Sequence, residues 1–478
     1  MAISSFTPTG KDYTQKVIGS ENYLDLQNSG WAQQYLPDLI AEEAEVFGQR
    51  TISGFLAQVS AEEAMSADQV VWSEQGRLHL SYECTITAAA ASTMKVAKTQ
   101  DGVAQTTGHG LRVGDMVLIA GGGQTITARV SVADAATTDA FTVTPYGFEH
   151  LDDAGFADGD DTCKVLVFGS EFAKGTTNQA TANEPVFSSF TNKPIIVKDM
   201  YEVSGSDAAQ IGWVEVSGED GQGGYYWYLK AAGDTKSRFN DYLEMVCIEA
   251  EKAAEASIAF GAANDVTGLH GTEGLFKAIT SRGHQSSGVT GINAATDLAE
   301  FDAMLAAFDE NGAIEENMMF LNRSTSLAID DMLASMNSYG AGGTSYGVFD
   351  NSEDMALNLG FSGFRRGSYD FYKSDWKYLN DKQTRGGINA AATGGEAIRG
   401  VVIPAGVSNV YDQGLGKNLK RPFLHVRYRA SNMESRKNKS WVTGSVGAVT
   451  SDLDAMTMNF LSERCMIVQG ANNFCLLN

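Results

Sequence analysis

The sequence is poor in positive charge. Its 35 lysines and arginines face 59 aspartates and glutamates, which gives 478 residues a formal net charge of −24. An acidic surface of this kind repels polyphosphate, so the composition argues against a dedicated nucleic-acid binder. No run is long and apolar enough to span a bilayer, and the N-terminus lacks a basic region followed by an apolar core. The sequence therefore indicates neither a membrane segment nor a signal peptide.

Cysteine and histidine are also scarce. No two of the five cysteines have the short spacing of a zinc knuckle or a redox motif (Cys84, Cys163, Cys247, Cys465 and Cys475). The six histidines lie far apart, and no pair has a metal-ligand spacing. We therefore expect reduced thiols in a cytoplasmic protein, with no metal site and no cofactor.

What the sequence does contain is an ordinary globular composition, with 43% hydrophobic and 20% charged residues, and enough length for about three domains. The β-branched run at 194–203 predicts a strand. Apolar residues then recur every three or four positions over 225–260, which predicts one long helix that ends at Gly261. A helix of this length with one apolar face needs a sheet or a layered core to cover it.

Between residues 85 and 168 the sequence changes to short alternating segments separated by glycines. Strands are predicted at 94–97, 116–119, 126–132, 140–144 and 163–168. Their even spacing is typical of a small β-barrel or sandwich. The segments 73–81 and 169–191 are polar and poor in core residues, so we expect the two legs of a long loop with this β-module at its tip.

The remaining segments are predicted to contain an extended arm, helices and strands. Residues 1–30 are polar and predict an extended arm, and 31–55 predict a helix that packs either on its own domain or on a neighbour. Helices are predicted at 298–308 and 324–336, the second capped by Ser324 or Thr325. Strands are predicted at 318–321, 369–372, 401–404, 424–429 and 466–470.

One candidate catalytic motif is present. Residues 343–347 match the nucleophile-elbow pattern G-x-S-x-G, and His425 follows Ser345 in the order of a hydrolase. The elbow needs a buried strand before it and a helix after it, whereas glycines precede this segment. The pattern therefore favours a flexible loop over a catalytic Ser345.

A basic cluster lies between residues 417 and 439, where the nearby acids in the sequence are Asp412 and Glu434. It contains Lys417, Lys420, Arg421, Arg427, Arg429, Arg436, Lys437 and Lys439. Three interpretations stay open: a solvated basic face, contact with an acidic surface of another copy of the chain, and contact with DNA.

The order of these pieces resembles the major capsid proteins of tailed bacteriophages, which have the Hong Kong 97-type fold. The resemblance begins at 70–74, a tryptophan segment that leads into an extended loop. It continues through the Val113-Gly114-Asp115 turn, the returning segments 168–172 and 191–196, and the strand 201–205 before the long helix.

The resemblance implies an α+β chain with the Hong Kong 97-type capsid fold. Its parts would be an N-terminal arm and helix at 1–69, an extended loop at 70–191 with a β-domain inserted at about 85–168, and a peripheral domain at 192–339. The spine helix would occupy about 225–260, an axial domain 340–450, and a C-terminal strand at 451–478 would return to the peripheral domain.

The resemblance also implies a non-enzymatic shell subunit that assembles into hexamers and pentamers of an icosahedral phage head. It would be formed in the host cytoplasm, reside in the virion and enclose double-stranded DNA without reading its sequence. Portal, scaffolding and cement or decoration proteins are the further partners implied. The candidate subunit-contact residues are Trp31, Trp72, Glu74, Lys417, Lys420, Arg421, Arg427, Arg429, Arg436 and Lys437.

Three alternatives remain. The same fold serves bacterial encapsulin-like nanocompartment shells. From other classes, a serine hydrolase would use Ser345 and His425, and a carbohydrate-binding or tail-adhesin protein would be built on the β-module. Closed shells or capsomers in the electron microscope would separate the shell proteins from the others.

Overall fold

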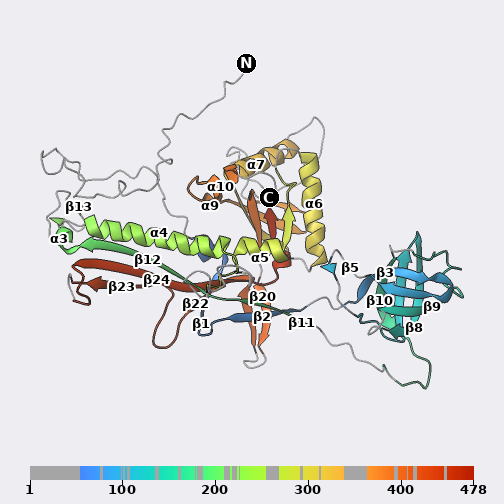
Figure 1. Cartoon of the computed structure of the whole chain (residues 1–478). Coiled ribbons are helices and arrows are strands. Elements are labelled where there is room, and N and C mark those ends of the chain that lie inside the picture. The colour runs from blue at the N-terminus through green and yellow to red at the C-terminus, as the bar shows by residue number, and fades with distance from the viewer. Residues whose placement is uncertain are drawn as a thin grey trace, which may run out of the picture. The chain divides into compact units, whose positions relative to one another are not determined.

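The computed structural model describes residues 54–478 with gaps at 76–78, 98, 101–102, 105–107, 135–138, 160–162, 178, 180–186, 209–215, 218–222, 225–226, 254–268, 291–293, 312–313, 338–362, 392–396, 406, 413–416 and 446–448. The chain divides into two compact units (Figure 1). The smaller unit runs from Ser73 to Phe190, and the larger unit combines the residues up to Trp72 with those from Thr191 onward.

The smaller unit is built around a closed barrel. Its strands follow the order β10-β3-β4-β9-β8-β7. The bounds are Ser81–Ala88 (β3), Thr93–Val96 (β4), Asp115–Gly121 (β7), Gln124–Asp134 (β8), Ala140–Pro145 (β9) and Cys163–Ser170 (β10), with a short helical turn at Ala89–Ala91 and the small pair β5 (Thr99–Gln100) and β6 (Val103–Ala104). The predicted small β-barrel is therefore confirmed with five of its strands, whereas β3 was not predicted.

Alternation along the strands explains why this short sequence can close a barrel. Inward positions carry side chains that are fully or almost fully buried, such as Ile86, Val117, Val130 and Phe141. Outward positions on the same strands are exposed, as the pattern of β10 shows. Because successive side chains of a strand point to opposite faces, one regular alternation fills the interior and turns the other side chains outward, among them Leu166 and Phe168 of β10.

The turn into β7 depends on a glycine. Gly114 has a φ of 97°, a conformation that L-residues rarely adopt. A side chain there would also meet the ring of Phe172 at 3.1 Å. The buried carboxylate of Asp115 accepts a hydrogen bond from the backbone N–H of Arg112 at 2.9 Å and so closes the turn.

The larger unit contains a five-stranded sheet organised around one long strand, β24 (Ala455–Val468). The order is β1-β22-β24-β12, and β23 also pairs with β24. The other strands are β1 (Ala61–Met65), β12 (Ile195–Ser204), β22 (Leu424–Arg429) and β23 (Lys439–Gly444). Because β24 spans 14 residues, β22 and β23 can pair along the same side of it one after the other.

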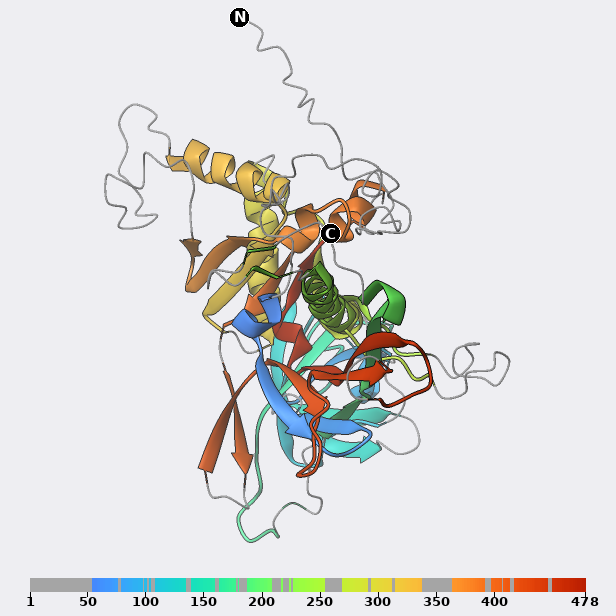
Figure 2. The same ribbon diagram turned by 90° about the vertical axis from the view of Figure 1, so that its left-hand side faces the viewer.

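Helix α4 (Trp227–Glu249) covers one face of this sheet, as Figures 1 and 2 show. Its buried Phe239 and Leu243 pack against Phe460 of β24, and the two phenyl centroids lie 5.9 Å apart. Arg238 of α4 forms an ion pair of 3.0 Å with Asp199 of β12. The predicted strand at 194–203 is confirmed. The predicted apolar face of the helix is confirmed in part, because Phe239 and Leu243 are buried, whereas Tyr242 is 41% exposed and Glu244, expected on the polar face, is buried.

The predicted end of the long helix is wrong. The helix stops at Glu249, and residues 250–253 are not helical although they continue the apolar stripe. Their backbone pairs instead with 270–274, since Ala253 N–H donates to His270 C=O and Gly274 N–H donates to Ala250 C=O. This tertiary pairing outweighs the helix propensity of the alanines.

A second sheet has six strands in the order β15-β25-β19-β16-β18-β17. Their bounds are His284–Ser286 (β15), Cys475–Leu477 (β25), Gly400–Pro404 (β19), Glu316–Leu321 (β16), Tyr369–Asp375 (β18) and Gly363–Arg366 (β17). Buried residues of helices α6 (Ala294–Glu310) and α7 (Arg323–Asn337) share one hydrophobic core with this sheet.

The second sheet and helix α7 differ from three expectations. β16 pairs with β18 and β19, so the expected boundary at residue 340 runs through the middle of one sheet. The expected C-terminal strand is two strands, β24 in the first sheet and β25 in the second. The cap of α7 is neither Ser324 nor Thr325, because the side chain of Asn322 accepts the N–H of Thr325 at 2.8 Å.

The two sheets of the larger unit meet at a shared core. Phe55 of α2 (Phe55–Val59) stacks on Trp376 at 4.2 Å, and α5 (Leu275–Arg282) buries Leu275 and Ile279 beside them. The remaining elements are β2 (Val70–Gln75), β11 (Phe187–Asn192), α3 (Gly205–Ala208), β13 (Val216–Ser217), β14 (Gly223–Gly224), α9 (Lys377–Asn380), α10 (Arg385–Ala391), β20 (Val407–Asp412), β21 (Lys417–Pro422) and the turn Ala471–Asn473. Among the described residues, no helix has the length and apolarity needed to cross a membrane.

Candidate subunit-contact surface

The face of the five-stranded sheet opposite α4 carries exposed apolar side chains. Strand register places Met200 of β12, Asn459 of β24 and Trp441 of β23 directly side by side. Because Asp199 and Phe460 point toward α4, these neighbouring positions point to the other face. We call the surface formed by Ile196, Lys198, Met200, Lys439 and Trp441 the open face.

The open face is more apolar than an ordinary exposed strand surface. Ile196 is 50% exposed, Met200 59% and Trp441 37%. Lys198 and Lys439 lie on either side of the buried Leu461. The ammonium group of Lys439 also lies 5.5 Å from the ring centroid of Trp441, close enough for a cation–π interaction. Large apolar side chains that gather on one regular face are characteristic of contact surfaces.

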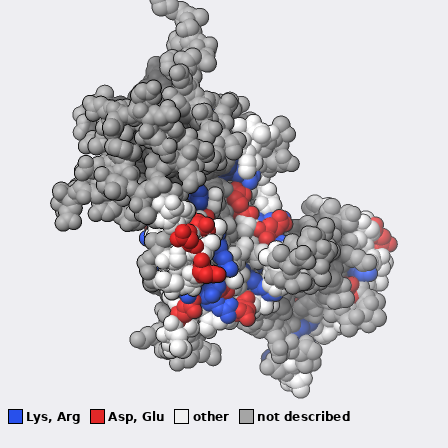
Figure 3. Space-filling view, turned by 60° about the vertical axis from the view of Figure 1, so that its left-hand side comes forward, with Lys and Arg blue, Asp and Glu red and all other residues white. Residues whose placement is uncertain are grey.

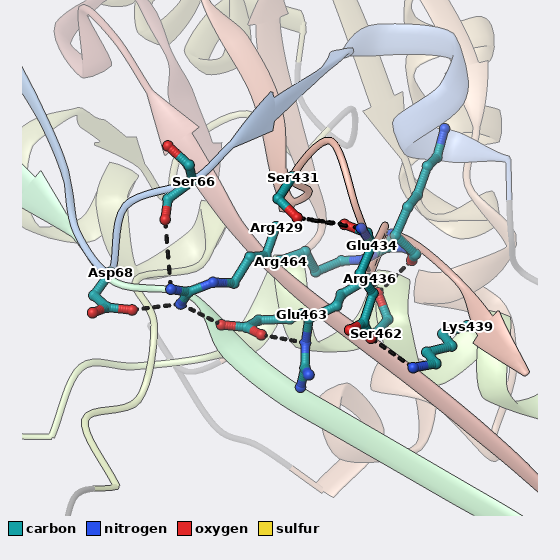
Figure 4. A network of polar contacts seen from close by, with 11 residues as sticks. Ser66, Asp68, Arg429, Ser431, Glu434, Arg436, Lys439, Ser462, Glu463 and Arg464 are labelled. Carbon is teal, nitrogen blue, oxygen red and sulfur yellow. Dashed lines mark hydrogen bonds and ion pairs between the residues drawn. The ribbon is translucent and has the colours of Figure 1, made fainter.

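Beside the open face lies a charged network centred on Glu463 (Figure 4). The Glu463 side chain is only 7% exposed and forms ion pairs with Arg429 at 3.0 Å and with Arg436 at 2.6 Å. Arg429 also contacts Asp68, which lies just after β1. Hydrogen bonds to Asp68 and then Glu463 raise the pKa of Arg429 above its usual value. A buried carboxylate between two arginines is a tightly held structural group.

Backbone hydrogen bonds fix the connection between β22 and β23 to the same network. Arg436 N–H donates to Arg429 C=O, and Glu463 N–H donates to Arg436 C=O. The carbonyl oxygen of Lys437 accepts from Ser462 at 2.6 Å and from Arg464 at 2.9 Å. The connection is therefore held along its length against β24.

The structure revises the interpretation of the basic cluster. Arg427 pairs with Glu63 at 3.0 Å, Lys437 pairs with Glu62, and Lys439 pairs with Glu434 at 2.6 Å. Four acids that pair with members of the cluster lie far from it in sequence: Glu62, Glu63, Asp68 and Glu463. On the described surface in Figure 3, basic and acidic side chains are accordingly intermixed. The described members of the cluster, from Arg427 to Lys439, are therefore not a concentrated positive patch.

The other candidate contact residues have different environments. Trp72 is only 7% exposed and lies under the guanidinium of Arg282, 5.7 Å from its ring centroid, so it has little surface to offer a partner. Glu74 is half-buried. Lys417, Lys420 and Arg421 lie on β21, whose backbone pairs with β20, but their side chains are outside the described part. Trp31 and the whole segment 1–53 are also outside the described residues.

The two residues of the hydrolase alternative do not form a described site. His425 is 1% exposed, and its backbone pairs with Ala61 and Ile467 inside the sheet. Ser345 lies outside the described residues, so the flexible loop expected for its motif stays a prediction. Within the described ranges, no group of three or more His, Cys, Asp or Glu side chains could hold a metal ion.

The sequence signals did not identify the open face. Ile196 and Met200 belong to a strand that was predicted from its β-branched residues, but alternation alone does not say which of its faces is covered. Trp441 lies in β23, which was not predicted. The pairing of β23 with β24 across Asn459 brings these residues together.

No protein-family model matches the chain, and no curated protein matches its sequence. Solved structures of phages align with it over most of its length. A structure from Mycobacterium phage Ogopogo is 11% identical, covers 97% of this chain and 99% of its own, and gives a TM-score of 0.39. One from Gordonia phage Cozz is 10% identical, with coverages of 94% and 93% and a TM-score of 0.38. The capsid structure of cyanophage P-SCSP1u is 11% identical, with coverages of 65% and 80% and a TM-score of 0.33. At TM-scores below 0.5 these alignments add nothing to the functional assignment.

Proposed function

We propose that this chain is a major capsid protein of a tailed phage, with a Hong Kong 97-type fold, and that its copies form the hexamers and pentamers of an icosahedral head shell. In this role it encloses double-stranded DNA without reading its sequence. The smaller unit is then the module carried by the extended loop, and α4 is the spine helix of the peripheral domain. Portal and scaffolding proteins are the further partners of such a shell, together with cement or decoration proteins where a head uses them.

The observation that carries this proposal is the open face. A five-stranded sheet with α4 on one side leaves Ile196, Met200 and Trp441 exposed on the other. Large apolar side chains that gather on one face of a sheet favour a contact surface, because burial against another subunit would remove them from water. The open face is therefore our candidate for the contact between copies of this chain, and it supports the proposal of self-assembly.

Electrostatics is compatible with contact between copies at this face. A net charge of −24 makes copies repel one another at long range, but salt screens exposed charges beyond about 10 Å at 0.1 M. At the open face Lys198 and Lys439 lie near the exposed Glu202, which follows Met200 on the same side of β12, and the adjacent arginines are neutralised by Glu63, Asp68 and Glu463. Charges of both signs therefore meet here, so the face does not concentrate charge of one sign.

Electron microscopy and sedimentation of the purified full-length protein test the proposal. We expect closed shells or capsomers for the wild type and slowly sedimenting folded protein for a Met200→Asp, Trp441→Ser double variant. Ile388→Asp is the matched control, because Ile388 is 57% exposed but lies on α10. Assembly of the double variant at the wild-type level would rule out the open face as a contact. Discrete monomers of the wild type under all salt conditions would contradict the proposed function itself.

A further inference from the structure

The barrel brings together two cysteines that the sequence places far apart. Cys84 lies on β3 and Cys163 on β10, and the register of these antiparallel strands makes them direct partners. Both side chains point into the barrel core, with exposures of 0% and 1%. Neither forms a disulfide in the structure.

We propose that Cys84 and Cys163 form a latent disulfide site, which a small-molecule disulfide oxidises to an intramolecular cross-link between the first and the last strand of the barrel. The proposal concerns the smaller unit alone and does not depend on the function proposed above.

The backbone geometry fits a disulfide. Residues directly opposite in an antiparallel pair have Cβ atoms about 4.5–5.5 Å apart and Cα atoms about 4.5–5.5 Å apart. A disulfide requires Cα atoms about 4.4–6.8 Å apart and Cβ atoms about 3.5–4.5 Å apart, so the Cα spacing fits and the Cβ atoms must approach each other by about 1 Å. Antiparallel partners on one face also direct their Cβ atoms to the same side of the sheet.

In the structure the two sulfur atoms are not turned toward each other, as expected for reduced thiols. A Cβ atom added to Gly121 of β7 would lie 2.4 Å from the Cys163 sulfur. The Cys163 sulfur therefore lies next to Gly121, on the side of β10 that faces away from β3. The Cys84 sulfur approaches its own strand, 3.8 Å from the carbonyl oxygen of Tyr82. Rotation of Cys163 about its Cα–Cβ bond turns its sulfur toward Cys84.

The closed barrel protects the pair. Burial, and then the neighbouring Cys163, raises the pKa of the Cys84 thiol well above its usual value, so little nucleophilic thiolate is present. Exchange therefore proceeds when the barrel opens or before it closes. Once an open form has reacted, the cross-link persists in the closed form, because burial shields it from reductant.

The chemistry is balanced two-step thiol–disulfide exchange. One cysteine thiolate attacks oxidised glutathione, forms a mixed disulfide and releases one glutathione thiol. The second cysteine attacks the mixed disulfide, forms the Cys84–Cys163 bond and releases the second glutathione. Two electrons pass from the protein thiols to the reagent, and both protons end on the released thiols.

The link would stabilise the barrel at its closure point. β3 and β10 are the first and last barrel strands in chain order, and their pairing completes the ring. A cross-link there closes a loop that contains the other four strands and so restricts the unfolded chain. We expect oxidation to raise the melting temperature of the smaller unit by several degrees.

The test incubates the full-length protein with oxidised glutathione at temperatures approaching its thermal transition. Free thiols are then alkylated, and cross-linked peptides are identified by mass spectrometry. We expect a Cys84–Cys163 peptide, its loss when dithiothreitol is added to the denatured protein, and a higher melting temperature of the oxidised protein. Glutathione adducts at these cysteines without the cross-link, or a lower melting temperature after cross-linking, would overturn the proposal.

Two variants that each remove one buried cysteine provide the control. Cys163→Ala should abolish both the cross-link and the oxidation-dependent shift, whereas Cys475→Ala, at a site that is also 1% exposed, should retain both. A shift that survives in Cys163→Ala would contradict the assignment. The wild-type peptide map decides the question even if Cys163→Ala folds poorly, because it identifies the linked residues directly.

Discussion

Glu244 of α4 accepts a hydrogen bond from the backbone N–H of Gly54, 190 positions earlier in the sequence, at 2.5 Å. This contact ties the long helix to the residue that precedes α2, whose Phe55 and Leu56 are buried in the main core. The carboxylate is largely removed from water, and burial raises the pKa of Glu244 to about 7, against the smaller opposing effect of the backbone donors.

The raised pKa of Glu244 makes stability depend on pH. The unfolded chain loses this proton near its ordinary value of 4.5, whereas the folded chain retains it until about pH 7. The folded state therefore binds more protons between these values, and its stability falls as pH rises from about 4.5 to 7. Melting temperatures across pH 4.5–8.5 measure the effect.

Glu244→Gln is the control, since it removes the titration but keeps the shape. We expect the melting temperature of the variant to increase relative to that of the wild type as the pH rises to about 7. Above that pH, the difference between the two melting temperatures should stay constant. A difference between the two proteins that does not change with pH would show that Glu244 titrates normally.

Phe239 should contribute strongly to the stability of the larger unit. It is fully buried between α4 and β24, so Phe239→Ala leaves a cavity and should cost about 3–5 kcal/mol. Tyr242→Ala on the same helix is the matched control, because Tyr242 is 41% exposed and surface changes of this kind cost about 0.5 kcal/mol or less. Chemical denaturation followed by circular dichroism compares the two variants, and similar losses would contradict the packing of α4 on the sheet.

Reversal of Arg427 and Arg429 to glutamate should destabilise the chain itself. Each new carboxylate would face acids that are now paired, Glu63 for position 427 and Asp68 with the buried Glu463 for position 429. We expect a clearly lower melting temperature that recovers partly at high salt, since salt screens the repulsion of exposed charges.

Lys439→Glu supplies the comparison for this double reversal. Lys439 pairs with an exposed partner, Glu434, and exposed pairs contribute little to stability. A double variant that melts like wild type while losing assembly would instead restore the view that these arginines contact another subunit.

Local sequence patterns predicted much of the secondary structure of this protein. Alternation predicted five of the six strands of the barrel, and the three-to-four spacing predicted most of the apolar face of α4, because both follow from backbone periodicity within a few residues. The same local signals failed at position 249, where the apolar spacing continues but the backbone pairs with 270–274. They also failed for the cap of α7, where Asn322 lies one position before the helix begins.

Only the tertiary structure decided which distant residues become neighbours. Sequence shows a basic cluster at 417–439, but the fold brings Glu62, Glu63, Asp68 and Glu463 to its members from Arg427 to Lys437 and neutralises them. Sequence shows scattered cysteines, but barrel closure sets Cys84 opposite Cys163. Charge pairing and thiol proximity act over a few ångströms in space, and strand register, which sets those distances, depends on the whole sheet rather than on any one segment.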